Sequence, residues 1–147
     1  ENFLWILSLI GAFSGMEFMA WFTHKYIMHG FLWVLHKDHH KKDHKSRFER
    51  NDTFFLFYAV VSMLFVISWS DYGFFYGLPI AIGIFLYGLT YFLVHDIFIH
   101  QRFKIFRNID NKYARGVRRA HKIHHKNINK EGGECFGMLF VPKKYFK

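Results

Sequence analysis

The sequence predicts an all-α integral membrane protein with a histidine-rich cap on the cytoplasmic side. Three observations lead to this prediction: long apolar runs, confinement of the basic residues to two segments, and histidines grouped where the apolar runs end. Hydrophobic residues make up 52% of the 147 residues and aromatic residues 22%. That composition is unusual for a soluble domain with a net charge of +9. We expect residues 1–147 to form a single membrane-embedded domain.

Three apolar runs are long enough to cross a bilayer as helices. They cover residues 2–23, which only Glu17 interrupts, and residues 53–70 and 73–94, which carry no charge. As helices they would span roughly 27 to 33 Å, the thickness of the hydrocarbon core. The third run contains Gly77 and Pro79, so we expect it to be kinked or split. Three spans are clear, and a fourth short span is the alternative.

The basic residues indicate which side of the membrane each segment faces. Seven of the twenty Lys and Arg lie in residues 25–50 and thirteen in residues 102–147. The positive-inside rule places both basic segments in the cytoplasm, and the turn at Asp71 outside. Because topology already explains the charge, we expect membrane lipids as partners and no nucleic acid.

Ten of the eleven histidines form four groups in the repeated pattern HxxxxH followed by HxxHH. The groups are His24 and His29; His36, His39 and His40; His95 and His100; His121, His124 and His125. Imidazole nitrogen is a ligand for Fe, Zn, Cu and Ni. Ten nitrogens are too many for one ion, so the pattern predicts two metal ions with four or five histidine ligands each. His44 falls outside the pattern, and we expect it to be a surface histidine.

Helix geometry treats the two histidine patterns differently. Histidines at i, i+3 and i+4 fall within about 100° of one another, so each HxxHH triplet should converge on one helical face. Histidines at i and i+5 point about 140° apart on an ideal α-helix. For His24 and His29, either the helix ends between them, near Gly30, or they serve two different metal ions. His95 and His100 raise the same question.

Two acidic residues lie close to the histidine groups. Asp96 is the candidate catalytic residue, because a carboxylate beside His95 can accept a ring N–H and fix the tautomer of a ligand. The alternative for Asp96 is an ion pair with Arg102 or Arg118. Glu17 could hydrogen-bond a ligand histidine, relay protons, or pair with a polar group of another span. Cys135 is the only cysteine, which excludes an internal disulfide.

Four segments resemble a known enzyme family over about residues 17–142. They read HKYIMHGFLWVLHKDHH, YFLVHDIFIHQRF, RRAHKIHHK and GGECFGMLFVP. These strings resemble the bacterial β-carotene 3-hydroxylases of the membrane fatty-acid hydroxylase and sterol desaturase superfamily. HxxHH alone is common to that superfamily; the longer strings and their spacing point to the carotenoid hydroxylases.

The resemblance implies a non-haem di-iron monooxygenase that hydroxylates C3 of the β-ionone ring of β-carotene, giving β-cryptoxanthin and zeaxanthin. It implies one hydroxylase domain over residues 1–147 in the bacterial inner membrane, often drawn with four helices. The ten patterned histidines would bind two Fe ions, with O₂ as co-substrate, and zinc could replace iron in purified protein. The carotenoid would come from the bilayer. Because no flavin or nicotinamide motif is present, electrons would come from a ferredoxin-type donor. The residues predict no oligomeric state.

Two other classes of function share these features. A carotenoid 4-ketolase or an acyl or sterol hydroxylase would have the same metal site and a different substrate pocket. A membrane metal transporter or a non-enzymatic metal-binding protein would also use histidines. Transport is disfavoured because Glu17 is the only charge within a span, whereas ion pathways place ionisable groups at mid-membrane.

Overall fold

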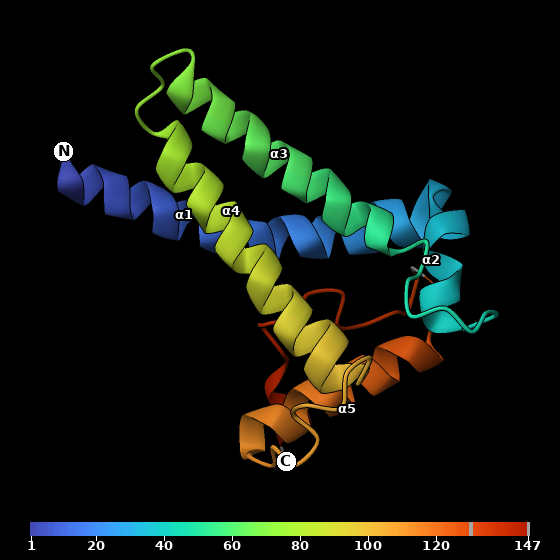
Figure 1. The fold of residues 1–147 in the computed structure, drawn as a ribbon. Helices are drawn as coiled ribbons and strands as arrows, with labels where there is room; N and C mark the ends of the chain where they lie inside the picture. Colours follow the sequence, from blue (N-terminus) through green and yellow to red (C-terminus); the bar gives the residue numbers. More distant parts are fainter. Residues whose placement is uncertain (130, 147) are drawn as a thin grey trace. The chain divides into compact units, whose positions relative to one another are not determined.

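The computed structural model describes residues 1–129 and 131–146, and these contain helices and loops without a strand (Figure 1). The predicted all-α class is confirmed. In chain order the elements are α1 (Asn2–Phe22), η1 (Thr23–Phe31), α2 (Trp33–His40), α3 (Asp52–Ser70), α4 (Gly77–Tyr91), η2 (Phe92–Ile99), α5 (Lys112–Lys126) and η3 (Lys143–Phe146). The segments η1 and η2 are π-helical, and each directly continues the α-helix before it.

Three continuous helices are long and apolar enough to cross a membrane, as predicted. They are Asn2–Phe31, Asp52–Ser70 and Gly77–Ile99, and the described residues contain no fourth. Large apolar side chains along these helices are exposed, for example Phe57 at 58% and Met63 at 62%. Exposure on this scale is expected for side chains that contact lipid. The first and third spans are longer than the apolar runs because the π-helical segments extend them.

The expected split of the third span is wrong. The helix α4 begins at Gly77, so Pro79 lies in its first turn, where a missing backbone N–H costs no helical hydrogen bond. Gly77 is needed for a close approach within the α3–α4 hairpin, since a Cβ there would lie 2.6 Å from the carbonyl oxygen of Phe65. Residues 71–76 make the turn, where Gly73 adopts a φ of +68°.

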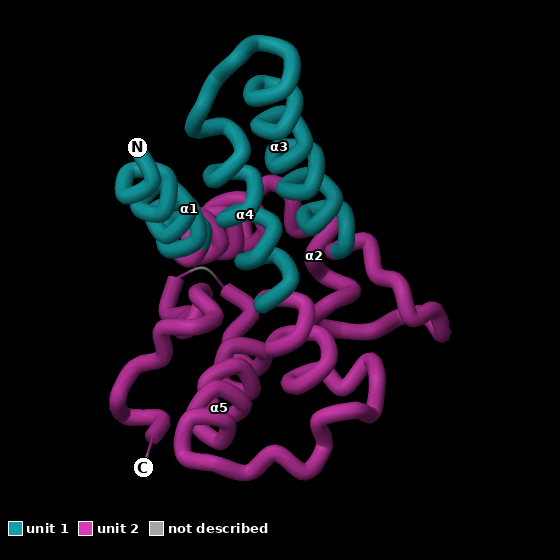
Figure 2. The backbone as a smooth tube through the Cα atoms, turned by 60° about the vertical axis from the view of Figure 1, so that its left-hand side comes forward, with its two compact units in different colours: residues 1–16, 52–90 teal, residues 17–51, 91–147 magenta. Residues whose placement is uncertain are grey.

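The chain divides into two compact units (Figure 2). The first unit contains residues 1–16 and 52–90, and it is formed by the N-terminal part of α1 with the α3–α4 hairpin. Phe13 meets Tyr87 edge-on with ring centroids 5.7 Å apart. The Ser62 hydroxyl donates to the Ala81 carbonyl over 2.9 Å. Small residues permit this packing, as is typical between membrane helices.

The second unit contains residues 17–51 and 91–147, and it holds every histidine of the chain. Its buried apolar residues include Phe98, Val117, Ala120 and Phe136. The helix α5 starts at a side-chain cap, because Asn111 Oδ1 accepts a hydrogen bond from the Ala114 N–H over 2.8 Å. The single domain expected over residues 1–147 stays a prediction.

Glu17 has a partner that the sequence did not suggest. Its Oε1 accepts hydrogen bonds from three successive backbone N–H groups of the C-terminal segment: Met138 at 2.9 Å, Leu139 at 2.9 Å and Phe140 at 3.1 Å. The segment approaches so closely that a Cβ on Gly137 would lie 2.9 Å from the same oxygen. Glu17 therefore anchors the C-terminal segment to the first long helix. The proposed proton relay at Glu17 stays a prediction.

Replacing Gly83 with Ala should destabilise the first unit. A Cβ at this position would lie 2.5 Å from the Leu9 carbonyl oxygen and 2.8 Å from the Ala12 Cβ, so α1 and α4 would have to separate. We expect a cost of about 1–3 kcal/mol, typical of overpacking, measured as a lower Tm in detergent. The matched control is Gly88→Ala on the same helix, where the Cβ would meet only Phe55 at 3.6 Å. Equal Tm values for the two variants would contradict the predicted close contact.

Candidate metal centre

The π-helical turns bring each HxxxxH pair onto one face. A π-helix closes its hydrogen bonds from i to i+5, so residues five apart lie over one another. In η1 the rings of His24 and His29 are 5.0 Å apart, and the backbone becomes non-helical only at Gly30, after both. In η2 the His100 N–H donates to the His95 carbonyl over 2.9 Å. The sequence offered two alternatives for each pair: a helix end between the two histidines, or binding to different metal ions. The structure shows neither, because each pair lies within one helical segment or at its cap and belongs to one group.

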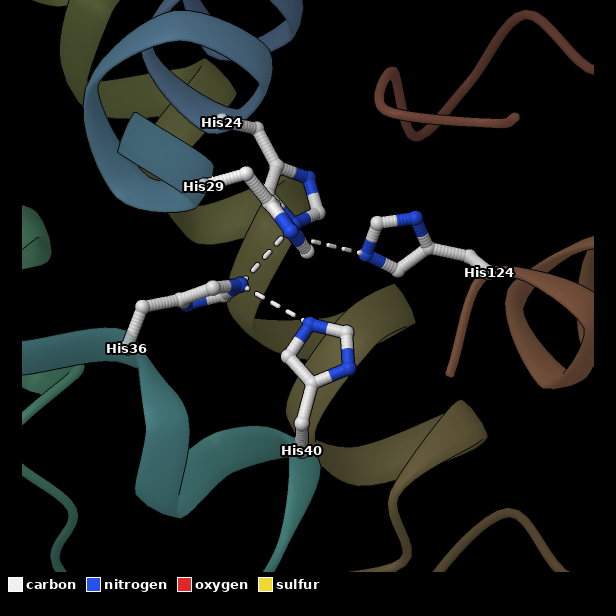
Figure 3. Close-up of side chains that lie close together, drawn as sticks. All are labelled: His24, His29, His36, His40 and His124. Atoms are coloured by element: carbon white, nitrogen blue, oxygen red, sulfur yellow. Dashed lines mark hydrogen bonds between the residues drawn. The ribbon is translucent and has the colours of Figure 1, made fainter. Parts of the chain in front are cut away.

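Nine histidines assemble into two groups. In each group one ligand atom per residue lies within 4.8 Å of all the others. The first histidine group consists of His24, His29, His36, His40 and His124, and the second of His39, His95, His100 and His121. Figure 3 shows the first group, whose imidazoles point toward one another from η1, α2 and α5.

The two HxxHH triplets are shared between the groups. From α2, His36 and His40 belong to the first group while His39 belongs to the second. From α5, His124 belongs to the first group and His121 to the second. The expectation that each triplet converges on one face is therefore wrong for the i+3 member, which faces the other group. Each triplet links the two groups.

The remaining two histidines take different places. His125 lies between the groups, with its ring 4.3 Å from that of His40 and 4.5 Å from that of His121. Its Nε2 is buried and has no hydrogen-bond partner among the described residues. His44 belongs to neither group, and its Nε2 lies 3.4 Å from Asp38 Oδ2.

An oxygen atom lies against Nδ1 of most grouped histidines, on the side away from the cluster. In the first group these oxygens are the Phe136 carbonyl for His24 (2.9 Å), the Ile128 carbonyl for His29 (2.7 Å), Asn51 Oδ1 for His36 (2.6 Å) and the Glu134 carbonyl for His124 (3.0 Å). In the second group they are Glu49 Oε2 for His39 (3.0 Å) and Asp96 Oδ1 for His95 (3.1 Å). Each acceptor assigns the ring proton to Nδ1, so Nε2 carries a lone pair.

The lone pairs inside the clusters are placed for a cation. His24 Nε2 lies 3.1 Å from His36 Nε2, and His29 Nε2 lies 3.2 Å from His124 Nε2. Since the protons of all four rings are engaged at Nδ1, no hydrogen is available between these nitrogens. Such facing lone pairs repel unless a metal ion lies between them, and metal-bound histidines typically donate Nδ1–H in this way. The first group therefore fits a metal site, and the second group offers four histidine ligand atoms that lie within 4.8 Å of one another.

Burial keeps the imidazoles outside the spans neutral at physiological pH. Burial lowers the pKa of His36 and of His124 to about 3 and that of His125 to about 4. It also lowers the pKa of His39 and His121 well below the usual 6.5. Neighbouring imidazoles lower these pKa values further. Neutral imidazole is the form that binds metal.

Asp96 satisfies both interpretations drawn from the sequence. One carboxylate oxygen, Oδ1, lies 3.1 Å from His95 Nδ1 and 3.4 Å from Arg102 Nε. Its role in catalysis stays a prediction.

Sequence reasoning missed Glu49 and Asn51, because polar residues in a basic loop have no spacing that relates them to histidines on α2. It also missed the backbone carbonyls of residues 128–136, which no side-chain pattern can reveal.

A polar cavity of about 340 Å³ lies beside the second histidine group. Four histidines line it, together with basic, acidic and amide side chains: His39, His40, His100, His125, Lys42, Arg47, Arg102, Glu49 and Gln101. On the first group, by contrast, aromatic rings are close. The Phe136 ring is 5.5 Å from His24, and the Trp33 ring is 5.3 Å from His29. The polar cavity thus lies beside the second group, although the Tyr91 ring also packs on His95 at 4.5 Å.

The metal-free protein should lose stability as the pH falls from 7 to 5. A histidine whose folded pKa lies below the unfolded value of about 6.5 contributes stability above that pH and loses it as the pH falls, because the unfolded state binds more protons. The lowered pKa values of His36 and His124 predict a falling Tm in detergent. The double variant His36→Gln/His124→Gln should show a shallower fall, and His44→Ala the same fall as the unaltered chain. A Tm that stays constant or rises would contradict the prediction.

Comparison with known proteins identifies the family. The fatty acid hydroxylase family matches residues 9–142. A β-carotene hydroxylase of Pantoea ananas is 41% identical over 143 residues, which cover 95% of this chain and 80% of the relative. A β-carotene hydroxylase of Paracoccus sp. (strain N81106 / MBIC 01143) is 38% identical over 144 residues, covering 96% and 85%.

A plant protein extends the similarity. The chloroplastic β-carotene 3-hydroxylase of Gentiana lutea is 36% identical over 142 residues, covering 92% of this chain and 42% of the relative. No solved structure matches the chain. From the family match and the extent of these similarities, the chain is a membrane-embedded hydroxylating oxidoreductase that belongs to the fatty acid hydroxylase family and, within it, to the β-carotene hydroxylases.

Proposed function

We propose that this chain hydroxylates C3 of the β-ionone ring of β-carotene, giving β-cryptoxanthin and then zeaxanthin, at two histidine-bound iron ions. The observation that carries the proposal is the convergence of histidine ligand atoms in two groups, with proton-free Nε2 atoms facing one another in the first group. The names of the bacterial and plant relatives support the choice of β-carotene, and the plant relative's name supports position 3.

The first histidine group would hold one iron ion and the second group the other, with His125 available between them. When bound, the iron ions supply the activation of O₂ that attack on an unreactive ring C–H bond requires. The protein supplies neutral nitrogen ligands in fixed tautomers, because the oxygens at Nδ1 orient each ring. It also excludes water on the side of the first group, where the rings of Phe136 and Trp33 pack against histidines.

The surroundings of the two groups support different routes for the substrate and for the protons and electrons. A carotenoid is a hydrocarbon dissolved in the bilayer, so its ring would approach from the lipid-exposed helices. Protons and electrons have to come from water, and the polar cavity beside the second group gives them a route. A ferredoxin-type donor would carry negative charge, and the exposed Lys42 and Arg47 at this cavity would attract it. We place this face on the cytoplasmic side of the bacterial inner membrane, where the positive-inside rule puts basic loops.

Pigment analysis tests the reaction. In a bacterial host that accumulates β-carotene and contains a ferredoxin-type donor, expression of the chain should convert the pigment to mono- and dihydroxylated carotenoids, resolved by chromatography. His39→Ala and His124→Ala should abolish the product, because each removes a ligand from one group. His44→Ala should retain it. A 4-keto product would identify a ketolase instead. An unchanged pigment with the protein confirmed in the membrane would contradict the carotenoid assignment.

Metal content tests the site independently of the substrate. Purified protein reconstituted with Fe²⁺ without oxygen should retain two ions per chain. His121→Ala and His124→Ala should each lower the content toward one, because they disrupt different groups. His44→Ala is the control and should retain both ions. Retention of two ions by the two ligand variants would argue against binding at these groups.

A further inference from the structure

The two histidine groups differ in the charge of the oxygens that hold their rings. Behind the first group every assigned acceptor is neutral: three are backbone carbonyls, and the fourth is the Asn51 amide oxygen, 2.6 Å from His36 Nδ1. Behind the second group both assigned acceptors are carboxylates. Glu49 Oε2 lies 3.0 Å from His39 Nδ1, and Asp96 Oδ1 lies 3.1 Å from His95 Nδ1.

Arg102 connects the two carboxylates. Its Nη2 lies 2.6 Å from Glu49 Oε2, and its Nε lies 3.4 Å from Asp96 Oδ1. The side chains of Arg102, Glu49 and Asp96 are only 10%, 9% and 12% exposed, so water screens the three charges little. The guanidinium favours the ionised form of both carboxylates and fixes their orientation toward the histidines.

The backbone around Gln101 positions this arginine. Gln101 adopts a φ of +53°, in the left-handed region, and follows His100, the C-terminal cap of the π-helical segment η2. The chain reverses there, and the Arg102 N–H donates to the Asp96 carbonyl over 2.9 Å. Such a left-handed residue after a helix is a common helix-ending conformation. It returns the Arg102 side chain toward Asp96, so that the ligand pair and its carboxylate partners form one network.

A carboxylate behind a histidine changes the ligand. It draws the Nδ1 proton toward itself, which makes Nε2 a more basic donor than it is with a carbonyl behind it. The buried charges beside the second group, two carboxylates and one guanidinium, sum to a negative charge that attracts a bound cation, whereas water screens the exposed Lys42 and Arg47 at the same cavity. Neutral oxygens behind the first group provide neither effect.

We propose that the second histidine group binds its metal ion more tightly than the first, and that Glu49 and Arg102 are the positioning residues that set this difference. The proposal rests on the two-ion site of the proposed function. The second group is filled first and retains its ion longest when a chelator competes.

A reciprocal exchange of the two acceptors provides the test. Glu49→Gln replaces a carboxylate by an amide behind His39, and Asn51→Asp replaces an amide by a carboxylate behind His36. The metal-free full chain in detergent is titrated with Co²⁺, and binding is followed by the visible absorption of the bound ion in competition with a chelator. The unaltered chain should bind two Co²⁺ in a tight step and a weak step. His121→Ala should remove the tight step and His124→Ala the weak one, which assigns each step to a group.

The two substitutions should change the Co²⁺ affinity of different binding steps. Glu49→Gln should weaken the tight step by about 10- to 100-fold, the usual effect of altering a residue that orients a metal ligand, and leave the weak step in place. Asn51→Asp should raise the Co²⁺ affinity of the weak step and so reduce the difference in affinity between the two steps. Asp43→Asn is the control, because it removes a negative charge from the same loop at an exposed side chain that contacts Arg50 rather than a histidine. It should change neither step.

Several results would overturn the proposal. Two equal steps in the unaltered chain, or loss of the weak step in His121→Ala, would show that the second group is not the tighter one. An equal effect of Glu49→Gln and Asp43→Asn would show that net charge alone sets the affinity. If the affinities are equal while the pigment assay still gives hydroxylated carotenoid, only this inference fails. Binding of no Co²⁺ together with unchanged pigment would reject the proposed function as well.

Discussion

The arrangement of the histidines depends on the hydrogen bonds at the opposite ring nitrogen. Each acceptor at Nδ1 fixes a tautomer and a ring orientation, and so leaves a lone pair at Nε2 pointing into a cluster. Without these acceptors the Nε2 atoms of His24 and His36, 3.1 Å apart, could share a proton and form an ordinary hydrogen bond. With them, the facing Nε2 atoms of His24 and His36 share no proton between themselves, and a cation would satisfy both. The acceptors therefore orient the clustered histidines as candidate metal ligands, and all of the acceptors belong to the second unit.

Two of the acceptors, the Phe136 and Ile128 carbonyls, lie 112 and 99 residues along the chain from the rings they hold. The C-terminal segment supplies the Phe136 carbonyl to His24, 112 residues earlier in the chain, and the Glu134 carbonyl to His124. Glu17 holds this segment by accepting three successive backbone N–H groups, and Gly137 leaves room for the carboxylate to approach. The carboxylate thus supports two ligands that it need not contact. An acidic residue in an apolar span is costly, and three hydrogen bonds from backbone N–H groups offset that cost.

The helices α1 and α4 change from α-helical to π-helical geometry where their histidines lie. An α-helix would point His24 and His29 to different sides, whereas the wider turn of η1 places both in one group. The same change occurs in η2 for His95 and His100. In the short α-helices α2 and α5 the ordinary spacing is kept, and there the i+3 histidine of each triplet crosses to the other group. Two π-helical pairs and two shared triplets thus give two histidine groups that are linked through the helices α2 and α5.

The sequence by itself determined the helical class, the three long apolar helices, the ten histidines to examine and the resemblance to carotenoid hydroxylases. The first three follow from composition, hydropathy and short-range spacing, which act locally along the chain, and the resemblance comes from four matching sequence strings. The partition of the histidines required the tertiary structure, because helical type at η1 and η2 is not encoded in a spacing that assumes an α-helix. The same holds for Pro79, which breaks nothing because α4 begins just before it. Glu49, Asn51 and the carbonyls of the C-terminal segment acquire their roles only through contacts that the loops make in the folded chain, as does the ion pair of Arg102 with Glu49, 53 residues away. Their effect on the histidines depends on where they lie in space, and the tertiary structure determines that location.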